Sequence, residues 1–285
     1  GDELNEARTL TRLGWVQYAA AELQEVLDTN QAALALYRKA GDRPGESIAF
    51  NDLGRAYLDL GEVPQALDAF QQALGLRPPD RDARGAANVL IRTALVYLNL
   101  AEWQQALDAL RQALVLARRA HDVRTECTAL VNLGSAYVTL GDTAEGLRHL
   151  EPAMKLARSI DFRGAEAYTL LWLGIAASLD GEPARSRELL EQAVAIQRAI
   201  KDVRGEASAL RQLATVQLAL ALPAEAQQSV ARSVEISPPA SGLIYTGALT
   251  LADVHAALGD ASRAEAQYKE ALARFRQIRA RHAEV

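Results

Sequence analysis

The sequence predicts an all-α fold, a solenoid of seven antiparallel helix pairs, and three observations support this prediction. Related blocks recur at a spacing of 40 residues, which shortens to 38 before the last block. Each block holds two apolar stripes at helical spacing, separated by a short break. Apolar residues make up 49% of the chain, mostly Ala and Leu, and only 5% of residues are aromatic, a composition that favours helices in close contact.

The repeat is clearest in three 25-residue blocks, which start at Phe50, Leu90 and Leu130. They read FNDLGRAYLDLGEVPQALDAFQQAL, LIRTALVYLNLAEWQQALDALRQAL and LVNLGSAYVTLGDTAEGLRHLEPAM. The Leu-Gly pair at 53–54 recurs, unchanged or altered, at 13–14, 93–94, 133–134, 173–174, 213–214 and 251–252. A self-match at a fixed period of this length indicates a repeat architecture.

The first helix of each unit follows from the block at Phe50. Phe50, Leu53, Gly54 and Tyr57 have the spacing i, i+3, i+4, i+7, which places them along one side of a helix. The helix is expected to end at Gly61, where the apolar stripe stops.

The second helix of the unit begins near Pro64, because proline suits the first turn of a helix. Its stripe contains Ala66, Phe70 and Ala73. The small residues here and at Gly54 allow the two helix backbones to approach closely. Half of the apolar surface of such a pair can be covered only by a neighbouring pair, so the pairs must stack.

The loops between units carry a helix-start signal, which reads GDRPGE at 41–46, HDVRTE at 121–126 and KDVRGE at 201–206. The Asp of each signal can cap the following helix, and the Glu falls in its positively polarised first turn.

These residues resemble the tetratricopeptide repeat family. The residues of one unit that match its signature are Leu53, Gly54, Tyr57, Ala66, Phe70, Ala73 and Pro78. The resemblance implies a right-handed superhelix with a concave groove that binds peptides. The 40-residue form is similar to the Pins/LGN adaptors and to the helical arrays of bacterial multidomain regulators of the MalT type.

We expect a single array over residues 1–285, excised from a longer protein because it begins at a repeat boundary. The expected repeats are 3–40, 43–80, 83–120, 123–160, 163–200, 203–238 and 241–279.

Three segments depart from the pattern. The first repeat lacks a Gly or Pro turn in YAAAELQEVLDTN, so it is either an ordinary end repeat or one fused helix able to swap between chains. Pro152 lies inside a second helix and should kink it. The linker ISPPASG at Ile236 is shorter, which could rotate the last pair.

Composition and motifs exclude several classes of function. The net charge of −5 offers no basic field for nucleic acid, and no apolar run is long enough for a membrane span. The single Cys127 fits a reducing compartment, so a cytoplasmic location is expected. The four His residues lie in different units without metal-ligand spacing, and no catalytic or nucleotide-binding motif occurs. We therefore expect no enzyme activity, cofactor or metal.

The groove implied by the resemblance lies opposite the core stripe of each first helix. In the second repeat this face carries Ile48, Asn51, Asp52, Arg55 and Asp59. Reading this face through the chain gives the candidate groove residues Arg12, Asn51, Arg55, Asn88, Arg92, Asn132, Ser135, Tyr168, Leu171, Trp172, Ile175, Arg211 and Gln212.

In the fifth repeat the five places equivalent to this face are all apolar, and they are Tyr168, Leu171, Trp172, Ile175 and Leu179. Leu171 and Leu179 are expected to pack between adjacent first helices. Tyr168 and Trp172 are either ligand anchors or core residues, since both aromatic types are frequent in binding hot spots.

Arg and Asn side chains run through the groove face of repeats one to four. Asn can hold a peptide backbone, and Arg can bind a carboxylate with two parallel hydrogen bonds. Alternatively, these are exposed polar residues paired with Asp52 and Asp59.

The sequence therefore predicts a non-enzymatic scaffold that binds an acidic or amphipathic protein segment in the groove. An alternative is the effector-sensing and self-assembly module of a bacterial transcription or signalling regulator. A third reading is a scaffold that oligomerises through its convex face. A homodimer through the degenerate first or last repeat is a further possible partnership.

Overall fold

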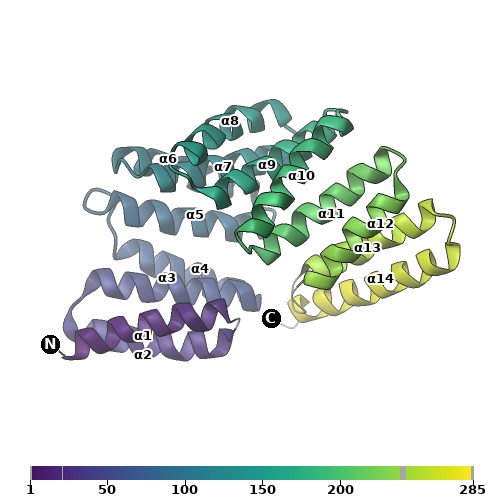
Figure 1. Ribbon diagram of the computed structural model, residues 1–285. Coiled ribbons are helices and arrows are strands. Elements are labelled where there is room, and N and C mark those ends of the chain that lie inside the picture. The colour runs from purple at the N-terminus through teal and green to yellow at the C-terminus, as the bar shows by residue number, and fades with distance from the viewer. Residues whose placement is uncertain (1, 21, 238–241, 284–285) are drawn as a thin grey trace. The chain divides into compact units, whose positions relative to one another are not determined.

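The computed structural model describes residues 2–20, 22–237 and 242–283, and in these ranges it contains helices and no strands (Figure 1). The helices of the first half are α1 (Asp2–Ala19), α2 (Leu23–Ala40), α3 (Arg43–Leu60), α4 (Val63–Gly75), α5 (Ala83–Asn99), α6 (Trp103–Arg119) and α7 (Val123–Thr139). Those of the second half are α8 (Thr143–Ser159), α9 (Arg163–Leu179), α10 (Pro183–Ala199), α11 (Val203–Ala219), α12 (Pro223–Ile236), α13 (Gly242–Ala257) and α14 (Ala261–Ala283).

The chain divides into two compact units, residues 1–132 and 133–285, with the boundary inside α7. Consecutive helices form the expected pairs, and the all-α solenoid prediction is confirmed. The prediction of one array running through residues 1–285 stays a prediction.

Small residues set the separation of the two helices in a pair. A Cβ atom at Gly54 would lie 2.7 Å from the ring of Phe70, and one at Gly174 would lie 2.8 Å from Leu190. Both distances are too short for a real contact, so these places admit only glycine unless the neighbouring side chain moves. The sequence prediction of close backbone approach is confirmed here.

An Asp in the loop between two pairs caps the first helix of the next pair. The backbone N–H groups of Gly45, Thr125 and Gly205 donate to Asp42, Asp122 and Asp202 at 3.2, 3.2 and 3.0 Å, which confirms the predicted caps.

Four of the junctions between pairs also contain an ion pair that the sequence analysis did not predict. In each, an Arg in the last turn of a second helix contacts a Glu in the first turn of the next helix. The pairs are Arg38–Glu46 (3.8 Å), Arg118–Glu126 (2.8 Å), Arg158–Glu166 (3.0 Å) and Arg198–Glu206 (2.9 Å).

The three segments that depart from the repeat pattern have different outcomes in the structure. The first repeat is an ordinary pair, because α1 ends at Ala19 and α2 begins at Leu23, so the fused-helix alternative is wrong. Helix α8 remains continuous through Pro152. The linker after Ile236 falls largely on residues 238–241, outside the described residues.

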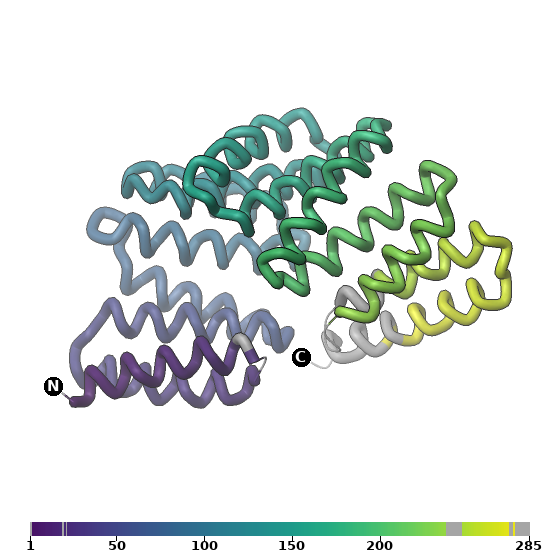
Figure 2. Tube along the Cα trace, viewed as in Figure 1, coloured from purple at the N-terminus to yellow at the C-terminus, as the bar shows by residue number. Residues whose placement is uncertain are grey.

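Within each unit the first helices of the pairs lie closer together than the second helices. Helix α3 contacts both α1 and α5, and α11 contacts both α9 and α13. In the described residues α2 does not contact α4, and α10 does not contact α12. Figure 2 traces these helices along the chain. A stack that is tighter on one side curves toward that side. The exposed side of the first helices is therefore the concave side of each unit, and we call it the inner face.

Candidate functional site

The inner face of the first unit carries a cluster of aromatic and charged side chains, which we call the Arg cluster. Its members are Trp15 and Tyr18 on α1, Asp52, Arg55 and Asp59 on α3, and Arg92 on α5.

Asp52 lies at the centre of the Arg cluster and is buried. The indole Nε1 of Trp15 donates a 2.7 Å hydrogen bond to its Oδ2, and the Arg55 guanidinium lies 3.6 Å from its Oδ1. Burial raises the pKa of the Asp52 carboxyl, although Trp15, Arg55 and Arg92 act to lower it. The carboxylate thus fixes the Trp15 ring on the inner face while about half of that residue stays exposed.

Arg55 is held by a second contact. Its guanidinium carbon lies 4.0 Å from the centroid of the Tyr18 ring, a cation–π geometry. The Tyr18 hydroxyl donates a 2.5 Å hydrogen bond to Asp59, and burial together with that carboxylate raises the pKa of the phenol. The contact between Arg55 and Asp52 agrees with one pairing of the alternative in which the polar residues pair with Asp52 and Asp59, and Asp59 accepts from Tyr18. The choice between the two readings stays a prediction. The Nε of Arg55 is nevertheless buried and makes no hydrogen bond within the described residues.

Arg92 is partly buried beside Arg55. Burial and the like charge of Arg55 lower the pKa of its guanidinium, and Asp52 only partly offsets them. Among the described residues Arg92 makes no ion pair or hydrogen bond, in contrast to Arg55. The Arg cluster therefore contains a cation without a direct partner.

The three candidate Asn side chains are engaged within the protein. The amide of Asn51 donates to Asp52 (3.3 Å), and those of Asn88 and Asn132 donate to the backbone carbonyls of Arg84 (3.0 Å) and Thr128 (2.8 Å).

Two of these Asn residues also share a small polar cleft of about 180 Å³ between α3 and α5. The cleft is lined by Ser47, Ile48, Asn51, Arg77, Gly85, Asn88 and Val89.

The inner face of the second unit is apolar on α9. Tyr168 is 42% exposed, and Trp172 and Ile175 are partly buried. Burial raises the pKa of the Tyr168 phenol, and the neighbouring Trp172 indole acts in the opposite direction.

Leu171 is buried as expected, but Leu179 is 59% exposed, so the prediction that Leu179 packs between adjacent first helices is wrong. The last turn of α9 buries Ala176 and Ala177 instead, and Leu179 lies on its outward side.

The remaining candidates are dispersed. Arg12 is exposed on α1, Arg211 and Gln212 are partly buried on α11, and Ser135 on α7 is buried. Burial lowers the pKa of Arg211, whose Nε has no partner in the described part of the chain. Burial excludes Ser135 and Leu171 from direct contact with a ligand.

Trp15 and Tyr18 are absent from the candidates that the sequence predicts, and Asp52 and Asp59 lie on the predicted groove face without being among those candidates. Tyr18 follows Trp15 by three residues on the same helix, and that spacing was the available signal.

The described residues offer neither a metal site nor a membrane span. They contain no group of three or more His, Cys, Asp or Glu side chains placed to bind a metal. None of the described helices combines the length and the apolar character needed to cross a membrane.

Comparison with known proteins decides the family. The chain matches the tetratricopeptide repeat family over residues 7–78 and 125–199, more than half of its length. It belongs to that family. No curated protein matches it significantly.

Solved tetratricopeptide repeat structures share the fold at low sequence identity. The apo form of RapI is 14% identical with a TM-score of 0.72, over 96% of this chain and 99% of that one. A Rap protein complexed with competence and sporulation factor is 16% identical with a TM-score of 0.66, over 98% of this chain and 92% of that one. The STAND protein PH0952 of Pyrococcus horikoshii, which has a tetratricopeptide repeat sensor, is 15% identical with a TM-score of 0.66. The match covers 95% of this chain and 42% of that one.

Proposed function

We propose that this protein is a non-enzymatic scaffold that binds a segment of a partner protein along the inner face, and that the segment is acidic with apolar side chains. The observation that carries this proposal is the partly buried Arg92 beside Arg55, which makes no ion pair or hydrogen bond with the described residues, together with the half-exposed ring of Trp15.

The charges of the Arg cluster favour an acidic ligand. Arg55 and Arg92 lie near one buried carboxylate, Asp52, while Asp59 is engaged by Tyr18. A ligand carboxylate at Arg92 would offset the desolvation of that guanidinium and could form two parallel hydrogen bonds with it. This interaction would weaken with added salt, because the site remains open to solvent.

Aromatic side chains supply the apolar part of the proposed interface in each unit. In the first unit the Trp15 ring is held in place by Asp52 before any ligand binds, so little side-chain entropy would be lost on binding. In the second unit Tyr168 and Trp172 lie one helical turn apart on α9. The similar Rap protein was solved with competence and sporulation factor bound, which is consistent with a peptide ligand for this fold.

A peptide display library selected on the wild-type chain tests the proposal, with affinities of the selected peptides measured by fluorescence anisotropy. We expect selected peptides to contain Asp or Glu next to apolar residues. Arg92→Gln should raise the Kd of peptides that bind the first unit by about tenfold, roughly the effect of losing one charge-assisted hydrogen bond. The double change Tyr168→Ala with Trp172→Ala should weaken the binding of peptides to the inner face of the second unit.

Matched controls separate binding from folding. Val115→Ser changes an exposed apolar residue of α6, away from the inner face, and should leave Kd unchanged. Arg92→Lys keeps the charge and should restore part of the affinity. Selected peptides without acidic residues, or an Arg92→Gln variant that folds normally and binds as tightly as the wild type, would contradict the acidic-segment proposal.

A second candidate is the effector-sensing module of a signalling regulator, favoured by the similarity to a STAND protein with a tetratricopeptide repeat sensor. A thermal-shift screen with a metabolite library distinguishes the two. A small molecule that raises the Tm of the wild type, but not the Tm of Arg92→Gln, would support the sensor over the peptide scaffold.

A further inference from the structure

Two guanidinium groups lie next to each other in the Arg cluster. Trp15 and Asp52, which share a hydrogen bond across neighbouring first helices, are 37 residues apart in the sequence. Arg55 and Arg92 have the same separation and occupy the equivalent places one repeat later, on α3 and α5. The like charge of Arg55 lowers the pKa of Arg92, in agreement with this close approach.

Both guanidinium groups keep hydrogen-bond donors that the protein does not use. The buried Nε of Arg55 makes no hydrogen bond within the described residues, and the Asp52 carboxylate lies 3.6 Å from its Nη1. Arg92 is partly buried and makes no ion pair or hydrogen bond with the described residues. Because burial removes part of their hydration, an anion that contacts both groups would restore the missing hydrogen bonds.

Arg55 is held in position before any ligand binds. Its guanidinium carbon lies 4.0 Å from the centroid of the Tyr18 ring, and the Tyr18 hydroxyl is itself fixed by a hydrogen bond to Asp59. Binding an anion would therefore cost little of the side-chain entropy of Arg55.

The inner face of the first unit carries more cations than anions. The five inner-face places on each of α1, α3 and α5 hold four arginines and two aspartates, a difference of two positive charges. These residues are Arg8, Arg12, Arg55, Arg92, Asp52 and Asp59. A ligand group with two negative charges would balance this face, whereas a single carboxylate would balance only half of the excess.

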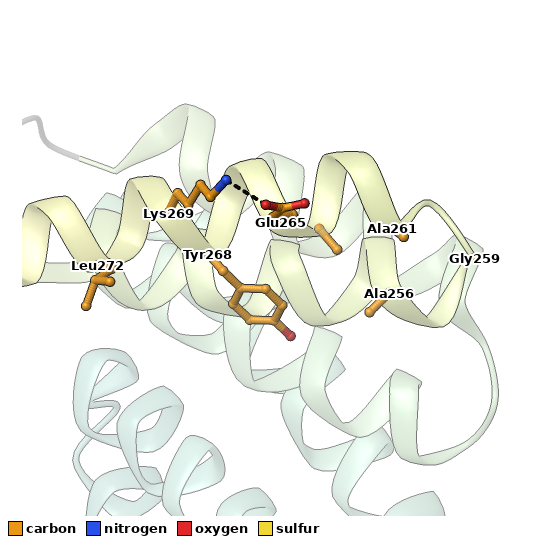
Figure 3. A pocket seen from close by; sticks show the side chains of 8 residues that line it. Ala256, Gly259, Ala261, Glu265, Tyr268, Lys269 and Leu272 are labelled. Atoms are coloured by element: carbon orange, nitrogen blue, oxygen red, sulfur yellow. Dashed lines mark ion pairs between the residues drawn. The ribbon is translucent and has the colours of Figure 1, made fainter.

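A cation of the second unit provides a contrast. Lys269 lines an open depression of about 470 Å³ on α13 and α14, together with Tyr268 and Leu272. Its ammonium group forms an ion pair with Glu265 on the same helix at 2.6 Å (Figure 3). The charge of Lys269 is thus already balanced within the protein, unlike that of Arg92.

We propose that the Arg cluster binds a phosphorylated side chain of a partner segment, with the phosphate between the guanidinium groups of Arg55 and Arg92. A phosphate monoester carries about 1.5 to 2 negative charges at pH 7 and three acceptor oxygens. Each guanidinium can donate two parallel hydrogen bonds to such a group. The half-exposed ring of Trp15 contacts an apolar residue beside the phosphorylated one.

This inference rests on the proposed function, because it specifies the acidic group of the segment that binds on the inner face of the first unit. The excess of two positive charges and the two adjacent guanidinium groups favour phosphate over the side chain of Asp or Glu.

A peptide library with a central phosphoserine and randomised flanks, selected on the wild-type chain, tests the inference. The best-bound sequence is then made with phosphoserine, Glu or Ser at the centre, and the three Kd values are measured by fluorescence anisotropy. We expect the phosphoserine form to bind about tenfold more tightly than the Glu form, the scale of one additional charge-assisted hydrogen bond. The Ser form should bind most weakly.

Variants locate the preference in the chain. Arg55→Gln and Arg92→Gln should each remove most of the preference for phosphoserine over Glu, because each leaves a single guanidinium. Lys269→Gln is the matched control, since it removes one positive charge from the second unit, and it should leave both Kd values unchanged. Circular dichroism shows whether each variant keeps its helices.

Inorganic phosphate separates a free anion from a phosphorylated peptide. Added at constant ionic strength, it should displace the phosphoserine peptide from the wild type but bind much more weakly than the peptide does. Inorganic phosphate that binds as tightly as the peptide would overturn the assignment of a peptide ligand.

Two further results would overturn the inference. If the Glu form binds as tightly as the phosphoserine form, the phosphate preference is refuted while the acidic-segment proposal stands. If folded Arg55→Gln and Arg92→Gln variants keep the full preference for phosphoserine, the phosphate does not bind at the Arg cluster.

Discussion

The inner faces of the two units are built from equivalent helix positions but differ in what the side chains do. In the first unit, Asp52 binds Trp15 and approaches Arg55, so most polar groups are used within the protein. In the second unit, α9 presents the side chains of Tyr168 and Leu179 to solvent.

This difference shows that one repeat scaffold can carry two kinds of surface. A charged network holds its aromatic ring in a fixed orientation, at the cost of burying a carboxylate. An apolar helix face is free to adapt but offers less specificity, since apolar contacts have little directionality. The first unit is therefore suited to selecting a ligand, and the second to adding contact area.

The largest expected effect concerns Asp52. Asp52→Ala should lower the free energy of unfolding by about 2–3 kcal/mol, because it removes the buried acceptor of the Trp15 hydrogen bond. Urea denaturation measures this change. Tyr168→Ala, on the half-exposed face of the second unit, should cost about 1 kcal/mol or less. Equal losses of unfolding free energy for Asp52→Ala and Tyr168→Ala would contradict the distinction between the inner faces of the two units.

Asp59→Ala is the matched control in the first unit. Asp59 is exposed and accepts a hydrogen bond from Tyr18, so its loss should have a much smaller effect than Asp52→Ala. Similar effects of the two substitutions would place the stabilising interaction at Tyr18 rather than at the buried carboxylate.

A smaller effect tests whether the helix pairs beneath the two faces are equivalent. Gly54→Ala should lower the free energy of unfolding by about 1–2 kcal/mol, because its Cβ meets the rigid ring of Phe70. Gly174→Ala should cost less, since Leu190 can change rotamer and alanine favours the helix by about 1 kcal/mol. Thermal unfolding of both variants gives the comparison, and a larger loss at Gly174 would contradict it.

The smallest effect is a pH dependence of opposite sign at two carboxylates. Burial raises the pKa of Asp52 above its usual 3.8. Its contribution to stability is therefore largest below pH 3.8 and is lost as the pH rises through the folded-state pKa. For Asp122, burial acts upward, but hydrogen bonds from Thr125 and the charge of Arg84 hold the pKa below 3.8. That contribution is present above pH 3.8 and is lost as the pH falls further.

Unfolding of Asp52→Asn and Asp122→Asn between pH 3 and 7 measures this contrast. As the pH falls, the stability of the wild type relative to Asp52→Asn should increase, and its stability relative to Asp122→Asn should decrease. Parallel pH profiles for the two variants would mean that Asp52 is not desolvated in the folded state.

Much of the fold and part of the candidate site could be predicted from the pattern alone. The spacing around Leu53 and Gly54 predicted the helix pairs, because a helical period and small contact residues are local properties of the chain. The same periodicity placed Arg55 and Arg92 on one face. It could not predict that Ser135 would be buried and Leu179 exposed, since burial depends on which neighbouring helix reaches each turn.

By itself, the sequence determined the repeat, the helix pairs, the Asp caps and the face on which Trp172 and Arg92 lie, because all of these follow from residue spacing along single helices. Only the tertiary structure decided that Asp52 binds Trp15, that Arg92 makes no ion pair or hydrogen bond with the described residues and that Leu179 stays exposed. Those outcomes depend on distances between residues of different helices, which a one-dimensional pattern does not contain.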